Sequence, residues 1–288
     1  MALVKDRAII LSTRPFGESD KIVRFFTVTS GKLSGIAKGA KKSQKRFMNT
    51  LEPFNQVRIE YFEKATSTLV RIENADLEES NGGLEVNLKR ICVASFFTEF
   101  VDKLTKEKQK NEHLFDTLRT ILKSLKTIEF TVTDILYYEL QMLEHLGYLP
   151  NLATCVHCGK DLSDAEKLYF SRERGGTLCP GCSGLVPHRQ YPQGFIPRMV
   201  TLNSAETGHP AGRHGDACSP EYPHSGSWVR EVPATGYVGV HTERPIGGLI
   251  AENTKGFERL GTEILEDFVG FHLAVELKSY RLLKRVTG

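Results

Sequence analysis

Four cysteines in two Cys-x-x-Cys pairs carry the clearest chemical signal in the chain. Cys155 and Cys158 form the first pair, Cys179 and Cys182 form the second, and the stretch 159–178 separates them. Two thiolates two residues apart lie on one side of a tight turn, and two such turns facing each other supply the four tetrahedral ligands of a closed zinc site. The spacing therefore predicts one structural Zn²⁺ ion.

Two other uses of these cysteines were weighed. Two disulfides are possible, but the chain starts without a secretory signal pattern, and a reducing cytoplasm favours metal binding. His157 and His188 could replace a cysteine, although four thiols already complete the site. A Cys₄ site leaves no position for water, and the His-Glu-x-x-His pattern is absent. A zinc deaminase needs His-x-Glu together with Pro-Cys-x-x-Cys, and neither His145 nor His157 is followed by Glu at the right place, so we expect no catalytic residues and no enzyme.

The residues around the cysteines indicate what positions them. The stretches Leu168–Ser171 and Gly175–Leu178 predict a short hairpin between the two pairs, so residues 151–190 resemble a zinc ribbon. A 3.6-residue apolar period predicts helices at 86–104, 112–125 and 133–146. A single final helix is expected at 258–284, with Leu260, Ile264, Phe268, Phe271 and Val275 on its buried face. The metal module is therefore predicted to be inserted in a helical domain made of residues 84–150 and 257–288.

Residues 1–80 follow a different period. Five short apolar runs, at 8–11, 22–28, 33–37, 56–62 and 67–72, are separated by turn residues such as Gly17 and Gly31. Five strands in so short a stretch predict a small antiparallel barrel, either an OB-fold or an SH3-like barrel, with the OB-fold preferred. The expected fold class is multidomain α+β.

Positive charge is concentrated in this predicted barrel. The net charge of the chain is only +3, yet residues 1–50 hold eleven Lys and Arg against three acidic residues. Many of these cations fall in the loop 38–47, and Phe47 ends it as a candidate for stacking on bases. A basic loop with an aromatic neighbour on such a barrel is typical of single-strand binding. The candidate nucleic-acid contacts are Arg14, Lys21, Arg24, Lys38, Lys41, Lys42, Lys45 and Arg46.

The composition is that of an ordinary globular protein of 288 residues, 40% hydrophobic and 25% charged. No apolar run approaches the length of about 20 residues that a membrane-spanning helix needs, so we expect a cytoplasmic protein with no membrane partner. One segment departs from this composition. Residues 199–252 contain eight Gly, five Pro and four His but no Lys or Phe, and they show no helical or strand period, which predicts irregular structure.

Several short motifs, taken in order, resemble the RecO family of bacterial recombination mediators and DNA-repair proteins. Their order along the chain is specific, and they cover about residues 3–195 and 257–285. They are Gly17-Glu18-Ser19-Asp20-Lys21, Ala37-Lys38-Gly39-Ala40-Lys41-Lys42, Leu51-Glu52-Pro53-Phe54, Leu146-Gly147-Tyr148 with Pro150, Cys155-x-x-Cys158-Gly159, Phe170-Ser171 before Gly175-Gly176, and Lys278-Ser279-Tyr280-Arg281-Leu282-Leu283.

The resemblance implies an N-terminal OB-fold, a helical domain carrying the zinc module, and binding of single- and double-stranded DNA with annealing of complementary strands. It also implies a RecR-type partner, the acidic C-terminal tail of single-strand-binding protein (SSB), and loading of RecA. From composition alone, a zinc-ribbon RNA-binding or transcription factor stays open.

Segment 199–252 departs from the family pattern, which continues there with helical, apolar sequence. One hypothesis is a compensated frameshift, in the gene or in the sequence record, and a lineage-specific insertion is the alternative. The coding DNA tests the first: the frameshift is excluded if neither other frame gives helix-like, family-like sequence across these codons.

Overall fold

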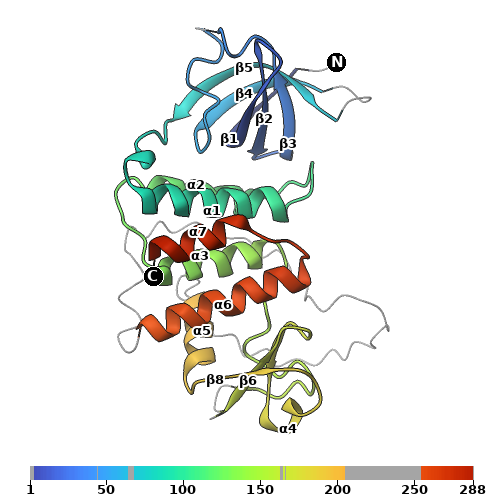
Figure 1. Cartoon of the computed structure of the whole chain (residues 1–288). Coiled ribbons are helices and arrows are strands. Elements are labelled where there is room, and N and C mark those ends of the chain that lie inside the picture. Colours follow the sequence, from blue (N-terminus) through green and yellow to red (C-terminus); the bar gives the residue numbers. More distant parts are fainter. Residues whose placement is uncertain are drawn as a thin grey trace. The chain divides into compact units, whose positions relative to one another are not determined.

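The computed structural model describes residues 3–43, 45–63, 68–162, 165, 167–204 and 254–287 (Figure 1). The chain divides into two compact units. Unit 1 comprises residues 1–131 and 277–288, and unit 2 comprises residues 132–276. The final residues of the chain therefore return to the first unit, and each unit is described by itself.

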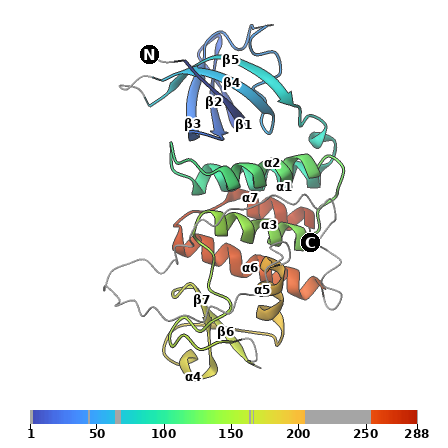
Figure 2. The ribbon, with the colours of Figure 1, turned by 180° about the vertical axis from the view of Figure 1, so that it is seen from behind.

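Unit 1 begins with a closed five-stranded barrel, seen from opposite sides in Figures 1 and 2. Its strands are β1 (Leu3–Phe16), β2 (Asp20–Thr27), β3 (Gly31–Ala37), β4 (Gln56–Phe62) and β5 (Val70–Glu79). The ring order is β1-β2-β3-β5-β4, and β4 closes the ring by pairing with β1. Among the five barrel strands, β3 and β5 pair in parallel, and all other neighbouring strands are antiparallel. This ring is OB-like, which confirms the preferred prediction.

The barrel interior follows from strand alternation. Inward residues such as Val23, Phe25, Val57 and Ile59 are completely buried, because every second side chain of a strand points to the same face. Gly35 allows β5 to approach β3, since a Cβ at this position would lie 2.8 Å from the Ile72 side chain. A close-packed core and a closed ring together give the loops a rigid base.

Three helices complete unit 1: α1 (Leu88–Leu104), α2 (Glu112–Ser124) and α7 (Lys278–Thr287), after a 3-10 turn, η1 (Leu84–Val86). The Asn87 side chain accepts hydrogen bonds from the first N–H groups of α1, and Asn111 does so for α2. The Glu99 carboxylate of α1 accepts from the Ser279 backbone N–H (2.8 Å), which fixes the start of α7 against α1. The first two predicted helices are confirmed, with small differences at their ends.

Within unit 1, Lys32 connects the barrel to the end of α1. Its side chain is 9% exposed, and its ammonium group donates to the carbonyl oxygens of Asp102 and Thr105, the latter at 2.5 Å. These carbonyls have no partner inside the helix because α1 ends there. Burial lowers the pKa of Lys32, and the nearby Asp102 carboxylate opposes that shift. Lys32 is therefore a structural cation.

Unit 2 holds α3 (Val132–His145), α5 (Phe195–Ser204) and α6 (Thr254–His272), and the cysteine module. The Thr133 side chain at the start of α3 donates to the Glu258 carboxylate of α6 (3.0 Å). Gly261 permits close packing of α6 on α3, since a Cβ there would lie 2.6 Å from the Leu136 side chain. The third predicted helix, at 133–146, is confirmed.

Two predictions about the C-terminal half are wrong. The single helix expected at 258–284 is two helices, because the chain breaks after His272 and Ala274 adopts a left-handed φ of 50°. As a result Phe271 is 48% exposed, and Leu265 and Val269 take the buried positions instead.

The start of the segment predicted to be irregular is also helical. Residues 199–204 belong to α5, where Met199 and Leu202 are buried. The rest of that segment, from residue 205 to residue 252, lies outside the described residues, as does the candidate frameshift. Among the described residues, no helix combines the length and apolar character needed to cross a membrane.

Candidate metal centre and nucleic-acid interface

The four cysteines come together as the spacing predicts. The Sγ atoms of Cys155, Cys158, Cys179 and Cys182 all lie within 4.8 Å of one another. The Cys158 and Cys179 sulfurs are 3.8 Å apart, far beyond the roughly 2 Å of a disulfide bond. A Zn–S distance of about 2.3 Å gives a tetrahedron edge of about 3.8 Å, so this donor set fits a zinc ion.

Local backbone structure presents the cysteines. In the first turn the Gly159 N–H donates to the Cys155 carbonyl (2.9 Å), and Gly159 adopts a φ of 74° that favours glycine. In the second turn the Cys182 N–H donates to the Cys179 carbonyl (3.0 Å), at the start of α4 (Pro180–Ser183). The two turns face each other because the Val156 N–H donates to the Thr177 carbonyl (2.9 Å).

The predicted hairpin between the cysteine pairs is present and gains a third strand. β6 (Leu168–Ser171) pairs with β7 (Gly176–Leu178), and β8 (Arg189–Tyr191) pairs with the other edge of β6. Neither His157 nor His188 belongs to the sulfur cluster. His188 instead packs edge-on against the Tyr169 ring, with centroids 5.0 Å apart.

The electrostatics favour a thiolate at Cys155. Burial raises the pKa of the Cys155 thiol, but the backbone N–H groups of Cys179, Cys158 and His157 outweigh burial and bring the pKa down to about 6. The Cys179 N–H lies 3.4 Å from the Cys155 sulfur. Backbone donors that stabilise a ligating thiolate are what a metal-binding turn requires.

The basic loop of the barrel is anchored by an acidic residue. The Asp20 carboxylate accepts from the Gly39 N–H (2.9 Å) and from the Ser19 hydroxyl (2.8 Å), and these bonds hold its pKa below the usual value. The Lys41 N–H donates to the Ser19 carbonyl (2.9 Å). These contacts fix the start of the basic loop against the β1–β2 turn, although β2 and β3 separate the two regions in sequence.

The eight predicted cations are not equivalent. Arg24 pairs with Asp102 at 2.6 Å, Lys21 with Glu52 at 3.0 Å, and Arg46 with Glu73 at 3.4 Å. The Lys41 ammonium donates to the Gly17 carbonyl (2.7 Å). By contrast, no side-chain ion pair within the described part of the chain involves the remaining four, all exposed: Arg14, Lys38, Lys42 and Lys45.

The prediction that Phe47 stacks on bases is wrong. Phe47 is 3% exposed and belongs to the barrel core, so it cannot reach a base. Sequence reasoning missed Phe16, which ends β1 beside the β1–β2 turn and is 51% exposed. Its position directly before Gly17 was the available signal, because a strand's last residue at a tight turn is poorly covered.

Comparison with known proteins follows the same division of the chain. The family model "Recombination protein O N terminal" matches residues 1–81, and "Recombination protein O C terminal" matches residues 86–194. Together these matches cover more than half of the chain. The chain belongs to the RecO family. The first RecO match ends just after β5, and the second ends just before α5.

Individual RecO relatives agree with the family models. Proteins named DNA repair protein RecO from Thermoanaerobacter sp. (strain X514) and Syntrophobacter fumaroxidans are each 37% identical, over 184 and 180 residues. These alignments cover 63% and 62% of this chain, and 72% and 71% of the relatives. The DNA repair protein RecO of Anaeromyxobacter sp. (strain K) is 30% identical over 234 residues, or 81% of this chain and 89% of the relative.

Proposed function

We propose that this RecO-family protein is a non-enzymatic mediator of DNA repair and recombination that binds single- and double-stranded DNA and anneals complementary strands. The observation that carries the proposal is the group of exposed cations, Arg14, Lys38, Lys42 and Lys45, around a pinned loop of an OB-like barrel. The names of its relatives support the repair role.

Annealing without a catalytic group depends on charge. Lysine and arginine contacts neutralise two phosphate backbones that otherwise repel each other, and the bases stay free to pair. Because Asp20 holds Gly39 in place, the lysines that follow extend from a fixed base. The exposed Phe16 ring, at the end of β1 beside the β1–β2 turn, offers a surface on which a base can stack.

Partners follow from family membership as part of the same proposal. A RecR-type protein and the acidic C-terminal tail of SSB are the expected protein partners. Through them the protein would assist loading of RecA on SSB-coated single strands, at the bacterial nucleoid. The zinc module would then stabilise unit 2 and would not bind DNA, because its cysteine side chains are directed at one another.

Zinc is the metal we propose for the cysteine cluster. Four thiolates with tetrahedral spacing suit Zn²⁺, and no position is left for a substrate. The ion would hold the two turns and the three-stranded sheet as one unit.

A strand-annealing assay tests the proposed function. The loop variant Lys41→Ala/Lys42→Ala/Lys45→Ala/Arg46→Ala should anneal complementary oligonucleotides at least about tenfold more slowly than the wild type, since each lost phosphate contact weakens binding. A matched control is Lys106→Ala/Lys123→Ala/Lys160→Ala/Lys255→Ala, which removes four exposed lysines outside the barrel. Equal annealing by the two variants would contradict the proposal.

A competition-binding experiment distinguishes the proposed function from the alternative, an RNA-binding or transcription-associated factor. Single-stranded RNA and DNA of the same sequence compete for the protein at one salt concentration. A clear preference for RNA, with no annealing of DNA, would favour the alternative.

A further inference from the structure

Two arginines occupy directly opposed positions on neighbouring barrel strands, outside the basic loop 38–47. In the antiparallel pairing of β1 with β4, Arg7 lies directly opposite Arg58, and both are exposed. Directly opposed side chains have Cβ atoms about 4.5 to 5.5 Å apart, and like charges in such a pair are destabilising. An anion bound between the two arginines would offset this repulsion, so the pair is suited to binding an anion.

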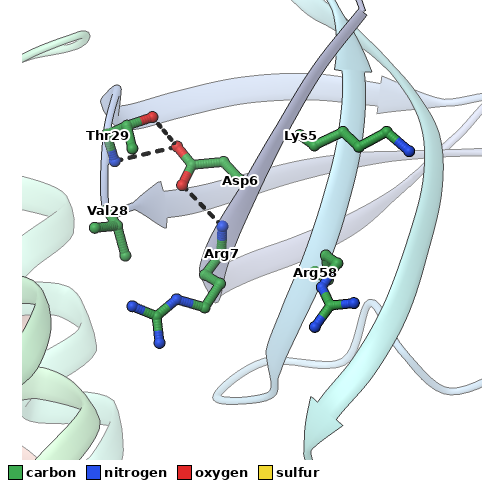
Figure 3. Close-up of a pocket in the computed structure, with 6 residues that line it drawn as sticks. All are labelled: Lys5, Asp6, Arg7, Val28, Thr29 and Arg58. Carbon is green, nitrogen blue, oxygen red and sulfur yellow. Dashed lines mark hydrogen bonds between the residues drawn. The ribbon is translucent and has the colours of Figure 1, made fainter.

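Neighbouring carboxylates do not neutralise Arg7. The Asp6 carboxylate accepts from the Arg7 backbone N–H (2.8 Å) and from the backbone N–H (3.1 Å) and hydroxyl (2.5 Å) of Thr29. Asp6 is therefore occupied by a turn, and Figure 3 shows that neither guanidinium group is directed at it. Arg58 pairs with Glu78 at 3.2 Å, and no ion pair of the Arg7 side chain occurs among the residues the structure describes.

The pair lines an open groove of about 380 Å³. The lining residues, drawn in Figure 3, are Lys5, Asp6, Arg7, Val28, Thr29 and Arg58. Three are cations, of which Lys5 pairs with Glu60 at 2.6 Å and Arg58 with Glu78, and the single lining carboxylate already accepts three hydrogen bonds. Guanidinium groups bind phosphate oxygens with two parallel N–H donors, so two adjacent arginines can hold one phosphate from both sides.

We propose that Arg7 and Arg58 form a second phosphate-binding site of the barrel, occupied by the DNA backbone. This proposal rests on the proposed function and extends it. Arg7 and Arg14 are seven positions apart on β1, which corresponds to about 23 Å along a strand. The barrel therefore contacts DNA at two separate places, at the basic loop and at the Arg7–Arg58 pair, and can hold separate stretches of backbone there.

The test uses the full-length protein with Arg7→Gln/Arg58→Gln. For a duplex oligonucleotide, the slope of log affinity against log salt should become shallower by about 0.9, the value for one phosphate contact, with roughly fivefold weaker binding at low salt. The matched control Arg71→Gln/Lys123→Gln removes two exposed cations from the same unit and should leave the slope unchanged. An unchanged slope in the Arg7/Arg58 variant overturns the proposal.

Two further readouts exclude other roles. Removing a like-charge pair should leave the melting temperature equal or higher, so a lower melting temperature together with unchanged DNA binding would assign a structural role and overturn the proposal. A poly-glutamate peptide tests whether the arginine pair binds an acidic protein segment instead of DNA. If Arg7→Gln/Arg58→Gln loses peptide binding and keeps DNA binding, the proposal is also overturned.

A third variant separates this proposal from the proposed function. Glu78→Gln releases Arg58 from its ion pair and should strengthen duplex binding about twofold, and weaker binding would count against the site. If only the four-residue loop variant loses annealing, the second site fails and the proposed function stands. If neither set of variants changes DNA binding, both fail.

Discussion

The cysteine module and the basic loop of the barrel are held in place by opposite means. The module closes on itself: four sulfurs lie within 4.8 Å, and backbone hydrogen bonds join its two turns. The loop opens to solvent: Asp20 fixes its start, and several of its lysines have no ion-pair partner among the described residues. The comparison supports the proposal that the most specific motif of the sequence stabilises the fold, and that the less specific charge pattern forms the DNA-binding surface.

Removal of the metal should have the largest effect. Structural zinc sites contribute on the order of 10 kcal/mol to folding, so chelation or Cys179→Ser should destabilise the module, measured by loss of near-ultraviolet circular dichroism and by thermal unfolding. DNA binding by the barrel should persist while unit 1 is folded. A protein that keeps its stability but loses DNA binding after chelation would move the binding site to the cysteines.

Two phenylalanines near the basic loop should differ when replaced by alanine. The buried Phe47 should affect stability, and the exposed Phe16 should affect single-strand binding. Phe47→Ala should lower the free energy of unfolding by about 3 to 5 kcal/mol, because a buried ring leaves a cavity. Chemical denaturation measures this loss. A Phe47→Ala protein of normal stability would place that ring at the surface.

Phe16→Ala should leave stability nearly unchanged and weaken single-strand binding by about 1 to 3 kcal/mol, the usual value for one stacked base. Duplex binding and the salt slope should not change, since no charge is removed. Fluorescence anisotropy with single-stranded and duplex oligonucleotides separates the two. An equal loss for both DNA forms would argue against stacking.

Lys32→Met should separate structural from binding cations. Its ammonium group holds the carbonyls at the end of α1, so the variant should lose about 1 to 3 kcal/mol of stability through unpaired buried acceptors. DNA affinity measured well below the unfolding transition should not change. A lower DNA affinity in the folded variant would add Lys32 to the binding surface.

Replacement of Asp20 should have the smallest effect, a change in the free energy of unfolding that is seen only at low pH. Because the pKa of Asp20 is lowered in the folded protein, its contribution to stability is complete above the unfolded value of about 3.9 and is lost as the pH falls through the folded value. Asp20→Asn should therefore weaken the acid dependence of stability below about pH 4. Urea denaturation at a series of pH values measures this, and an unchanged dependence would remove Asp20 as the loop's anchor.

The sequence predicted most of this architecture because its local signals agree. Strand alternation and Gly turns predicted the barrel, and the two Cys-x-x-Cys pairs predicted the cluster. The errors arose where tertiary packing decides: the helical period continued through residues 273–277, although the chain breaks there, and Phe47 turns inward because the barrel needs an apolar side chain at that point. Arg24 looked like its basic neighbours, but its partner Asp102 lies far along the chain, at the end of α1.

The salt dependence of single-strand binding tests the central claim most directly. Each phosphate contact to a single strand adds about 0.7 to the slope of log affinity against log salt, so a site made of Arg14, Lys38, Lys42 and Lys45 has a slope of about −2.8. Lys41→Ala/Lys42→Ala/Lys45→Ala/Arg46→Ala should make the slope shallower by at least about 1.4, the contribution of Lys42 and Lys45, while the control Lys106→Ala/Lys123→Ala/Lys160→Ala/Lys255→Ala keeps it. An unchanged slope in the loop variant would contradict the assignment of DNA binding to the barrel loop.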